Sequence, residues 1–181
     1  MPEEEKIKTK KGVYLPQSLL RWIRKQQLTD RALALITLLV FAGDQLSKFW
    51  VGRVFMLGES RPLLPGIFHL TYVRNPGGAF GLLAHKTSFF IVASLLVIFL
   101  IIFGGRYLKT HFFLSRLALA LLLGGVLGNL GDRLRTGYVI DFLDFRFWPV
   151  FNFADVALVL GIFLLAAGFL DPDFLPPGHR E

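Results

Sequence analysis

The residues from Thr87 to Gly105, TSFFIVASLLVIFLIIFGG, form a run of 19 positions without a charged side chain. At a rise of about 1.5 Å per residue, such a helix approaches the roughly 20 residues that cross the hydrocarbon core of a bilayer. Of the 181 residues, 54% are apolar and 18% charged, against about 25% charged in an ordinary soluble domain. With a mean hydropathy of +0.55, the composition predicts a membrane protein and excludes a disordered chain, a collagen and a coiled coil.

Three further apolar runs accompany this one. The first extends from Ala32 to Val51 and carries Asp44 and Lys48 in its second half; the others extend from Leu117 to Gly131 and from Val156 to Leu170. The last two reach the length of a span only if their helices include neighbouring polar residues. We therefore expect four transmembrane helices with ionisable groups within or beside the spans, where such groups are expensive and usually functional.

The distribution of charge predicts the orientation. The formal net charge is +7, and residues 1–31 hold eight Lys/Arg against four Asp/Glu. A basic flank before the first span is typical of the cytoplasmic side, whereas a nucleic-acid-binding protein would gather its positive charge on a polar folded face. Alternate loops and tails share the Lys/Arg residues twelve to seven, so both termini are expected in the cytoplasm and the loops at about 52–86 and 131–154 outside.

This pattern divides the chain into three parts. Residues 1–30 form a basic cytoplasmic extension, residues 31–170 a transmembrane domain, and residues 171–181 a cytoplasmic tail. Within the outer loops, residues 67–73 (IFHLTYV) are rich in aromatic and β-branched side chains and residues 137–145 (GYVIDFLDF) alternate in part, so we expect two strands that could pair. The predicted fold class is an all-α membrane protein with four transmembrane helices and a small extracytoplasmic β-sheet.

Polar and ionisable residues collect at the outer ends of the predicted spans, while the inner ends carry little beyond basic flanks. The outer set consists of Asp44, Lys48, Asn129, Asp132, Arg133, Asp141, Asn152 and Asp155. Helix packing does not require polar groups to gather at one leaflet. This asymmetry is therefore the main functional signal of the sequence.

Several of these residues also have a structural interpretation. Asp44 and Lys48 lie four positions apart and are expected to form an ion pair on one helix face, unless one of them touches a substrate. Asp132 is expected to tether the following loop or a neighbouring base. Asp155 or Asn152 would cap the helix that begins there.

Asp141 is harder to explain structurally because it lies between apolar residues of the predicted strand, where no cap is needed. Two carboxyl groups held close in a partly dry site share a proton. The ionised carboxylate can take a proton from a water that attacks a peptide carbonyl, while the protonated partner hydrogen-bonds the carbonyl oxygen. Such a peptidase needs no metal and no other cofactor.

Other protease chemistries find little support in the sequence. The chain has no cysteine, its four histidines form no H-E-x-x-H zinc motif, and no serine lies in G-x-S-x-G. Among hydrolytic mechanisms, a pair of acids remains.

Five motifs across residues 30–170 resemble those of lipoprotein signal peptidase (signal peptidase II), a family of bacterial aspartyl peptidases. They are Asp44 to Lys48 (DQLSK), Arg74 to Gly81 (RNPGGAFG), Gly128 to Arg133 (GNLGDR), Val139 to Phe142 (VIDF) and Phe151 to Asp155 (FNFAD). The resemblance implies that Asp141 and Asp155 are the catalytic acids. It further implies supporting or substrate-binding roles for Asp44, Lys48, Asn75, Asn129, Arg133 and Asn152.

The resemblance also implies a substrate and a location. The substrates would be prolipoproteins whose cysteine already carries diacylglyceryl, and cleavage just before that cysteine would release the signal peptide. The enzyme would act as a monomer in the bacterial cytoplasmic (inner) membrane, in contact with membrane lipids and without nucleic acid, metal or cofactor. Its active site would face the outer leaflet.

Two other functions remain open on the residues alone. A small proton- or ion-coupled transporter would also place Asp and Lys within spans. Transporters usually keep such groups near the midplane and often show internal symmetry, and the sequence has neither feature. A structural membrane subunit would leave the outer polar cluster without a purpose.

Overall fold

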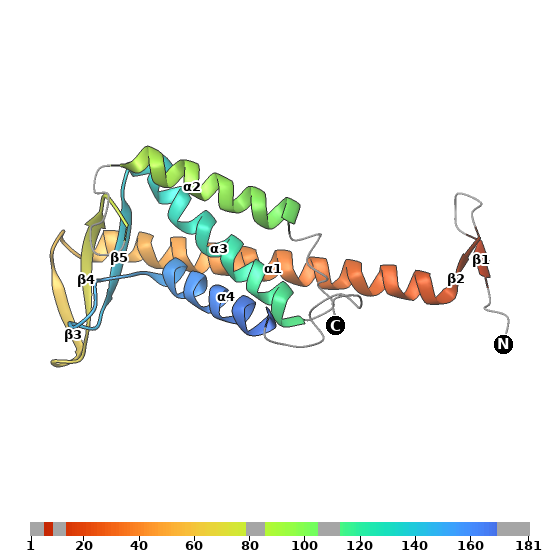
Figure 1. Ribbon diagram of the computed structural model, residues 1–181. Coiled ribbons are helices and arrows are strands. Elements are labelled where there is room, and N and C mark those ends of the chain that lie inside the picture. Colours follow the sequence, from red (N-terminus) through yellow and green to blue (C-terminus); the bar gives the residue numbers. More distant parts are fainter. Residues whose placement is uncertain (1–5, 9–13, 79–85, 105–112, 170–181) are drawn as a thin grey trace. The chain divides into compact units, whose positions relative to one another are not determined.

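The structure, a computed structural model, describes residues 6–8, 14–78, 86–104 and 113–169. The predicted tail at 171–181, parts of the extension at 1–30 and residues 79–81 of the motif RNPGGAFG lie outside the described residues. In the N-terminal unit, residues 1–35, strands β1 (Lys6–Lys8) and β2 (Tyr14–Pro16) pair antiparallel, and helix α1 begins at Gln17 (Figure 1). The sequence predicts only a basic extension here, so this hairpin is an addition.

The described residues form long helices wherever the sequence has an apolar run. The helices are α1 (Gln17–Val54), α2 (Thr87–Phe99), α3 (Phe113–Thr136) and α4 (Phe153–Phe169), and a π-helical turn, η2 (Leu100–Gly104), continues α2. Three segments are long and apolar enough to cross a membrane, namely Asp30–Val54, Thr87–Gly104 and Ser115–Thr136. The fourth apolar helix, Phe153–Ala167, is shorter, so a fourth crossing stays a prediction.

Two helices extend beyond their apolar runs because they take in polar residues. Helix α3 continues past Gly131 through Asp132 and Arg133 as far as Thr136. Helix α4 begins at Phe153 and so carries Asp155 in its first turn. Both findings confirm the expectation that the short runs belong to helices with polar ends.

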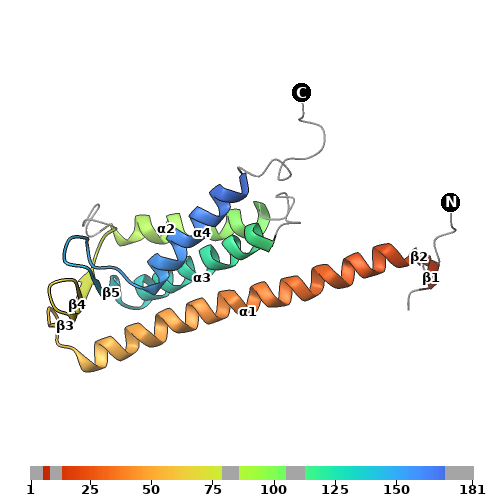
Figure 2. The same ribbon diagram turned by 90° about the horizontal axis from the view of Figure 1, so that it is seen from below.

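Helix α3 lies against both α2 and α4 (Figure 1 and Figure 2). Glycines permit the close approach to α4: a Cβ atom at Gly125 would lie 2.6 Å from the carbonyl oxygen of Ala154, and one at Gly161 would lie 2.7 Å from Cγ of Leu122. Small residues at helix contacts are typical of membrane proteins, where association depends on close packing. Helix α2 has no buried residue among its apolar side chains, as expected of a helix that faces lipid.

A three-stranded antiparallel sheet of order β3-β4-β5 lies at one end of the helices (Figure 1). Its strands are β3 (Ser60–Leu64), β4 (Phe68–Asn75) and β5 (Val139–Asp144). The pairing of β4 with β5 confirms the two predicted strands. Strand β3 is not predicted, because its residues, SRPLL, do not alternate between apolar and polar side chains and include a proline.

A small apolar core attaches this sheet to the C-terminal end of α1. It consists of Val51 from the last turn of α1, Phe55 just after the helix, Tyr72 from β4 and Phe142 from β5, all less than 10% exposed. In the register of the sheet, Val73 lies opposite Asp141. The core therefore holds β5, and with it Asp141, at the end of the helix bundle.

Candidate active site

Strand β5 and the residue that ends β4 place Asp141 in a polar pocket between apolar neighbours. Its carboxyl group is buried and accepts two side-chain hydrogen bonds, from Nδ2 of Asn75 at 2.9 Å and from Nδ2 of Asn152 at 2.6 Å. Asn75 is the last residue of β4. Asp141 thus accepts hydrogen bonds from two side-chain amides and, within a strand, does not cap a helix.

Asp155 lies in the first turn of α4 and has contacts of two kinds. Its Oδ2 accepts from the backbone N–H of Asn152 at 3.2 Å, while Oδ1 of Asn152 accepts from the backbone N–H of Asp155 at 3.0 Å. This reciprocal pattern is a capping box and confirms the structural interpretation of both residues. The other oxygen, Oδ1 of Asp155, accepts from Nδ2 of Asn129 at 2.8 Å.

Asn152 connects the two acids. Besides capping α4, its fully buried side chain donates from Nδ2 to Oδ1 of Asp141 at 2.6 Å and to Oδ1 of Asn129 at 3.2 Å. Asn129 in turn donates to Asp155. The two acids, which lie on different elements, are therefore linked through one buried pair of amides.

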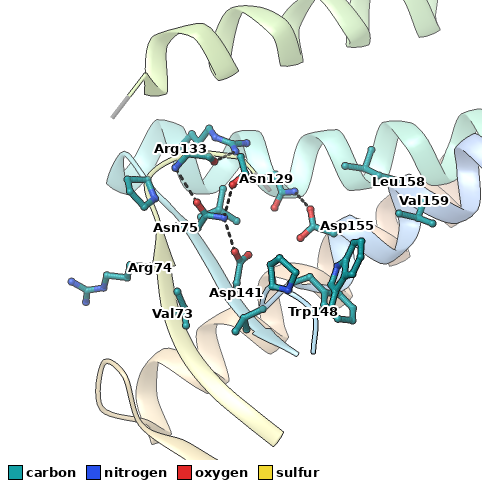
Figure 3. Close-up of a pocket in the computed structure, with 17 residues that line it drawn as sticks. Val73, Arg74, Asn75, Asn129, Arg133, Asp141, Trp148, Asp155, Leu158 and Val159 are labelled. Carbon is teal, nitrogen blue, oxygen red and sulfur yellow. Dashed lines mark hydrogen bonds between the residues drawn. The ribbon is translucent and has the colours of Figure 1, made fainter. Parts of the chain in front are cut away.

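Both acids line a cavity of about 580 Å³ (Figure 3). In Figure 3 the side chains of Asp141 and Asp155 project into the same space, with Asn75, Asn129 and Arg133 above them in this view. The cavity is otherwise lined by residues 73–78, Val139, residues 148–151, Leu158 and Val159. An apolar cavity with a few convergent polar groups is the usual form of a small binding or catalytic site.

The electrostatic setting of Asp141 favours proton exchange near neutral pH. Burial and the negative charge of Asp155 raise the pKa of Asp141 to about 7, although the hydrogen bonds from Asn75 and Asn152 oppose this rise. A carboxyl group with such a pKa can hold a proton or release one at neutral pH, as a general acid or base must. Asp141 is thus fitted to acid–base chemistry.

Lys48 is the centre of a buried charge cluster beside the cavity. Its Nζ lies 2.8 Å from Oδ2 of Asp44 and 2.9 Å from Oδ2 of Asp132, and it donates to Oδ1 of Asn129 at 2.9 Å. The predicted Asp44–Lys48 ion pair is confirmed. Lys48 and Asp44 do not line the 580 Å³ cavity; Lys48 reaches it through Asn129, which carries the contact on to Asp155.

Asp132 and Arg133 are adjacent near the C-terminal end of α3 but make contacts of different kinds. Asp132 accepts a long hydrogen bond, 3.3 Å, from the backbone N–H of Ile140, so it ties α3 to β5 beside Asp141, as the expected tether would. Arg133 donates to the carbonyl oxygen of Gly77 at 3.0 Å and its guanidinium lies 4.6 Å from the ring centroid of Phe90. Arg133 lines the cavity.

Sequence reasoning missed two polar residues of this cluster. Gln45 donates from Nε2 to Asp44, to the carbonyl oxygen of Gly128 and to Asp132. Arg135 donates to Asp132 at 3.0 Å and to Oε1 of Gln45. The available signal was their position: each lies within three residues of an acid of the cluster, on the same helix.

Comparison with known proteins identifies the family of this chain. The family profile of signal peptidase (SPase) II matches residues 36–170. The lipoprotein signal peptidase of Moorella thermoacetica is 55% identical over 146 residues, covering 81% of this chain and 95% of that protein, and that of Pelotomaculum thermopropionicum is 46% identical over 139 residues, covering 77% and 91%. A solved structure described as a bacterial membrane enzyme superposes with a TM-score of 0.71 at 30% identity, covering 77% of this chain and 87% of that one. The chain belongs to the signal peptidase II family and is a membrane protease.

Proposed function

We propose that this protease removes the signal peptide from diacylglyceryl-modified prolipoproteins, cutting just before the lipidated cysteine, with Asp141 and Asp155 as its catalytic acids. The observation that carries the proposal is that both acids line one cavity and are joined through Asn152 and Asn129. The names of the relatives, lipoprotein signal peptidases, support the substrate class.

The two acids can hydrolyse a peptide bond while sharing one proton. The ionised carboxylate takes a proton from a water molecule while the water oxygen bonds to the scissile carbonyl carbon. The protonated carboxyl group donates a hydrogen bond to the carbonyl oxygen as negative charge develops there. The tetrahedral intermediate then breaks its C–N bond, and a proton from the pair passes to the leaving amine. That amine becomes the N-terminus of the lipidated cysteine, and the signal peptide leaves as a carboxylate.

The depth of the site suits a lipidated substrate. A cysteine with two acyl chains is fixed at the membrane surface, so its peptide bond must be cut near the headgroups. Asp141 lies on the sheet beyond the helix ends and Asp155 in the first turn of α4. The apolar side chains of Leu158 and Val159, one turn further along α4, continue the cavity wall toward the membrane interior, where a signal helix or acyl chains could lie.

The proposal includes an arrangement of the chain in the membrane. Residues 31–170 form the peptidase domain with four spans, both termini lie in the cytoplasm, and the acids face the outer leaflet of the bacterial inner membrane. The basic flank at residues 1–31 and the polar outer ends of α3 and α4 support this orientation. Lys48, Asp44, Asn75 and Arg133 then support the site, and the enzyme acts as a monomer.

The test replaces each acid by its isosteric amide. Purified Asp141→Asn and Asp155→Asn enzymes are expected to cleave a diacylglyceryl-modified prolipoprotein at least about 10²-fold more slowly than the wild type, because one partner of the proton exchange is lost. Cleavage is followed by the mass shift of the product, and folding by thermal unfolding in detergent.

Two controls make this test specific. Glu59→Gln, at an exposed ion pair on the sheet, is expected to leave turnover unchanged, and Asp132→Asn is expected to lower thermal stability rather than the turnover of folded enzyme. Full turnover by Asp141→Asn or Asp155→Asn would overturn the assignment, as would a folded but inactive Asp132→Asn enzyme. Loss of activity in strong chelators that zinc restores would indicate a metal mechanism instead.

A further inference from the structure

Asp144 is a buried acid that the proposed mechanism does not use. It ends strand β5, three residues after Asp141, and is 4% exposed. Its Oδ2 accepts from Oγ1 of Thr71 at 2.7 Å and from Nη1 of Arg146 at 3.0 Å, and its Oδ1 accepts from the backbone N–H of Arg146 at 2.8 Å. This buried carboxylate therefore accepts three hydrogen bonds, one from β4 and two from the residues just after β5, and such an arrangement needs an explanation.

These bonds hold the backbone in an unusual conformation. Arg146 has a φ of +66°, and among the described residues it is the only one other than glycine with a positive φ. Side chains with a Cβ rarely adopt this left-handed region unless surrounding contacts enforce it. Both the backbone and the side chain of Arg146 are bound by Asp144, so this acid supplies the enforcing contact.

The residues that follow Arg146 form a wall of the cavity. The chain reverses at residues 145–150 and returns to β5, where the backbone groups of Phe151 and Leu143 exchange hydrogen bonds of 2.8 and 3.0 Å. Trp148, Pro149, Val150 and Phe151 all line the cavity that contains Asp141 and Asp155, and Trp148 lies along one side of it in Figure 3. The position of this wall depends on how the reversal is held at its start.

The Asp144 carboxylate, when ionised, is well suited to hold the start of this chain reversal. Burial alone would raise the pKa of Asp144, but the hydrogen bonds from Thr71 and Arg146 outweigh burial and keep the pKa below its usual range. The groups facing Asp144 from the neighbouring strand are Thr71 and, directly across the register, His69. His69 contacts Ser60. Hydrogen bonds to an ionised group are the stronger kind.

We infer that Asp144, held by Thr71 and Arg146, is a positioning residue that fixes the 145–151 wall of the cavity and so determines how tightly the substrate is held, without taking part in the chemistry. This inference rests on the proposed function for its substrate. Phe151, the last residue of the wall, is paired with Leu143 directly before Asn152, so loosening the wall at Arg146 leaves the amide bonds to the two acids in place. The effect should therefore fall on KM and spare kcat.

The test uses a matched pair at the neighbouring strand, because Asp144→Asn alone could impair folding. Thr71→Val removes the hydroxyl donor at nearly constant shape, and Thr71→Ser keeps it. We expect Thr71→Val and Asp144→Asn to raise KM for the diacylglyceryl-modified prolipoprotein about tenfold, the loss expected for one hydrogen bond to a charged group. The kcat and its pH profile should change less than about twofold, and Thr71→Ser and Glu59→Gln should behave as the wild type.

A second readout does not depend on activity. The chain has three tryptophans, Trp22, Trp50 and Trp148, so a Trp22→Phe, Trp50→Phe background leaves Trp148 as the sole reporter in the wall. In this background we expect Thr71→Val and Asp144→Asn to lower the fluorescence anisotropy of Trp148, and Thr71→Ser to leave it unchanged.

The outcomes separate the two proposals. Unchanged KM and unchanged Trp148 anisotropy in Thr71→Val would overturn the positioning role, as would an equal effect of Thr71→Ser. A lower active fraction with unchanged KM would also overturn it, because that result indicates a general structural role. If the wild type failed to cleave the prolipoprotein, the proposed function would fail, while Trp148 anisotropy would still decide whether Asp144 holds the wall.

Discussion

Lys48 is the residue on which the buried charges around the site depend. It is 1% exposed and lies between two buried carboxylates, Asp44 and Asp132, at 2.8 and 2.9 Å. Removing one member of a buried ion pair leaves an uncompensated charge and costs about 3–5 kcal/mol. We expect Lys48→Met to lower the free energy of unfolding by about this amount, as measured by thermal or denaturant unfolding in detergent.

The control for this prediction is the same replacement at an exposed lysine. Lys86 precedes α2 and is exposed, so Lys86→Met is expected to change stability by less than about 0.5 kcal/mol. Equal stability of the Lys48→Met and Lys86→Met proteins would mean that the buried carboxylates do not need Lys48. Adding Asp132→Asn to Lys48→Met should recover part of the lost stability, because one of the unpaired charges is then removed.

Asp141 is expected to make the enzyme less stable as the pH rises. Its pKa is raised to about 7 in the folded protein, from its ordinary value of 3.8, so between these pH values the folded state keeps a proton that the unfolded state releases. Raising the pH through this window therefore favours unfolding. The melting temperature should fall between about pH 4 and pH 8 by several degrees, since one pKa unit corresponds to about 1.4 kcal/mol and about 1 kcal/mol to about 2–4 °C for chains of this size.

The Asp141→Asn protein serves as the comparison in this experiment. Titrating groups other than Asp155, which is coupled to Asp141, act alike on both proteins. The difference between their two curves of melting temperature against pH therefore reports the titration of Asp141 together with this partner. The melting temperature of Asp141→Asn should fall less with rising pH than that of the wild type, because the contribution of Asp141 is missing. Parallel curves would contradict a raised pKa of Asp141 in the folded state.

For single residues, the sequence indicates the candidate site residues more readily than it predicts their hydrogen-bond partners. Asp141 stands out because an acid interrupts an apolar strand, and the Asp44–Lys48 pair follows from helical spacing alone. The hydrogen bond from Asn152 to Asp141 could not be predicted, because an Asn before a helix is already explained as a cap. Its Nδ2 lies beside Asp141 because the chain returns to β5 at Phe151. That return ends in the pairing of Phe151 with Leu143 of β5, and no local sequence pattern signals this pairing.

At the scale of elements, the contact between α3 and α4 determines where Asp155 lies relative to Asn129. Gly125 faces the start of α4 so closely that an added Cβ would lie 2.6 Å from the backbone oxygen of Ala154 and 2.9 Å from Cγ of Leu158. A backbone oxygen cannot move aside cheaply. We expect Gly125→Ala to push the two helices apart, to lower the melting temperature by at least several degrees, and to reduce cleavage through the altered Asn129–Asp155 bond.

Gly131 provides the matched control on the same helix. An added Cβ there would meet its nearest atoms, from Phe41 and Gln45, at 3.8 and 3.9 Å, which is ordinary contact. Alanine also has the higher helix propensity, by about 1 kcal/mol, so Gly131→Ala should be neutral or slightly stabilising with normal turnover. If Gly125→Ala and Gly131→Ala behaved alike in unfolding and cleavage assays, close helix packing would not be what places Asp155.

The elements themselves were predictable where one physical signal dominates. Long uncharged runs become helices in a membrane because every backbone group must be satisfied within the segment, and the described residues of all four runs are helical. The ends were less predictable, since polar residues such as Asp132 and Asp155 lower the hydropathy while continuing the helix. Strand β3 depends on pairing with β4 over an irregular register between Pro62 and Leu64, and no local pattern signals such a partner.

At the scale of the whole molecule, the proposed site requires that α4 cross the membrane. Its apolar part, Phe153–Ala167, is 15 residues or about 22 Å long, shorter than the roughly 30 Å of a typical hydrocarbon core. A short span is accommodated by local thinning of the bilayer. We therefore expect the tail after α4 to lie in the cytoplasm, on the side opposite the sheet.

The absence of cysteine from the chain makes this topology directly measurable. Arg61→Cys places a thiol on β3, where the Arg61 side chain is exposed although it contacts Glu59 and the ring of Phe55. Arg180→Cys places one in the predicted tail. In spheroplasts, a membrane-impermeant maleimide should label Arg61→Cys at once and Arg180→Cys only after permeabilisation. Lys109→Cys, in the predicted inner loop, should behave as Arg180→Cys does. Labelling of Arg180→Cys from outside, with Lys109→Cys still protected, would mean that α4 returns without crossing, and the acids would then lack the membrane depth that the cleavage of a lipidated substrate demands.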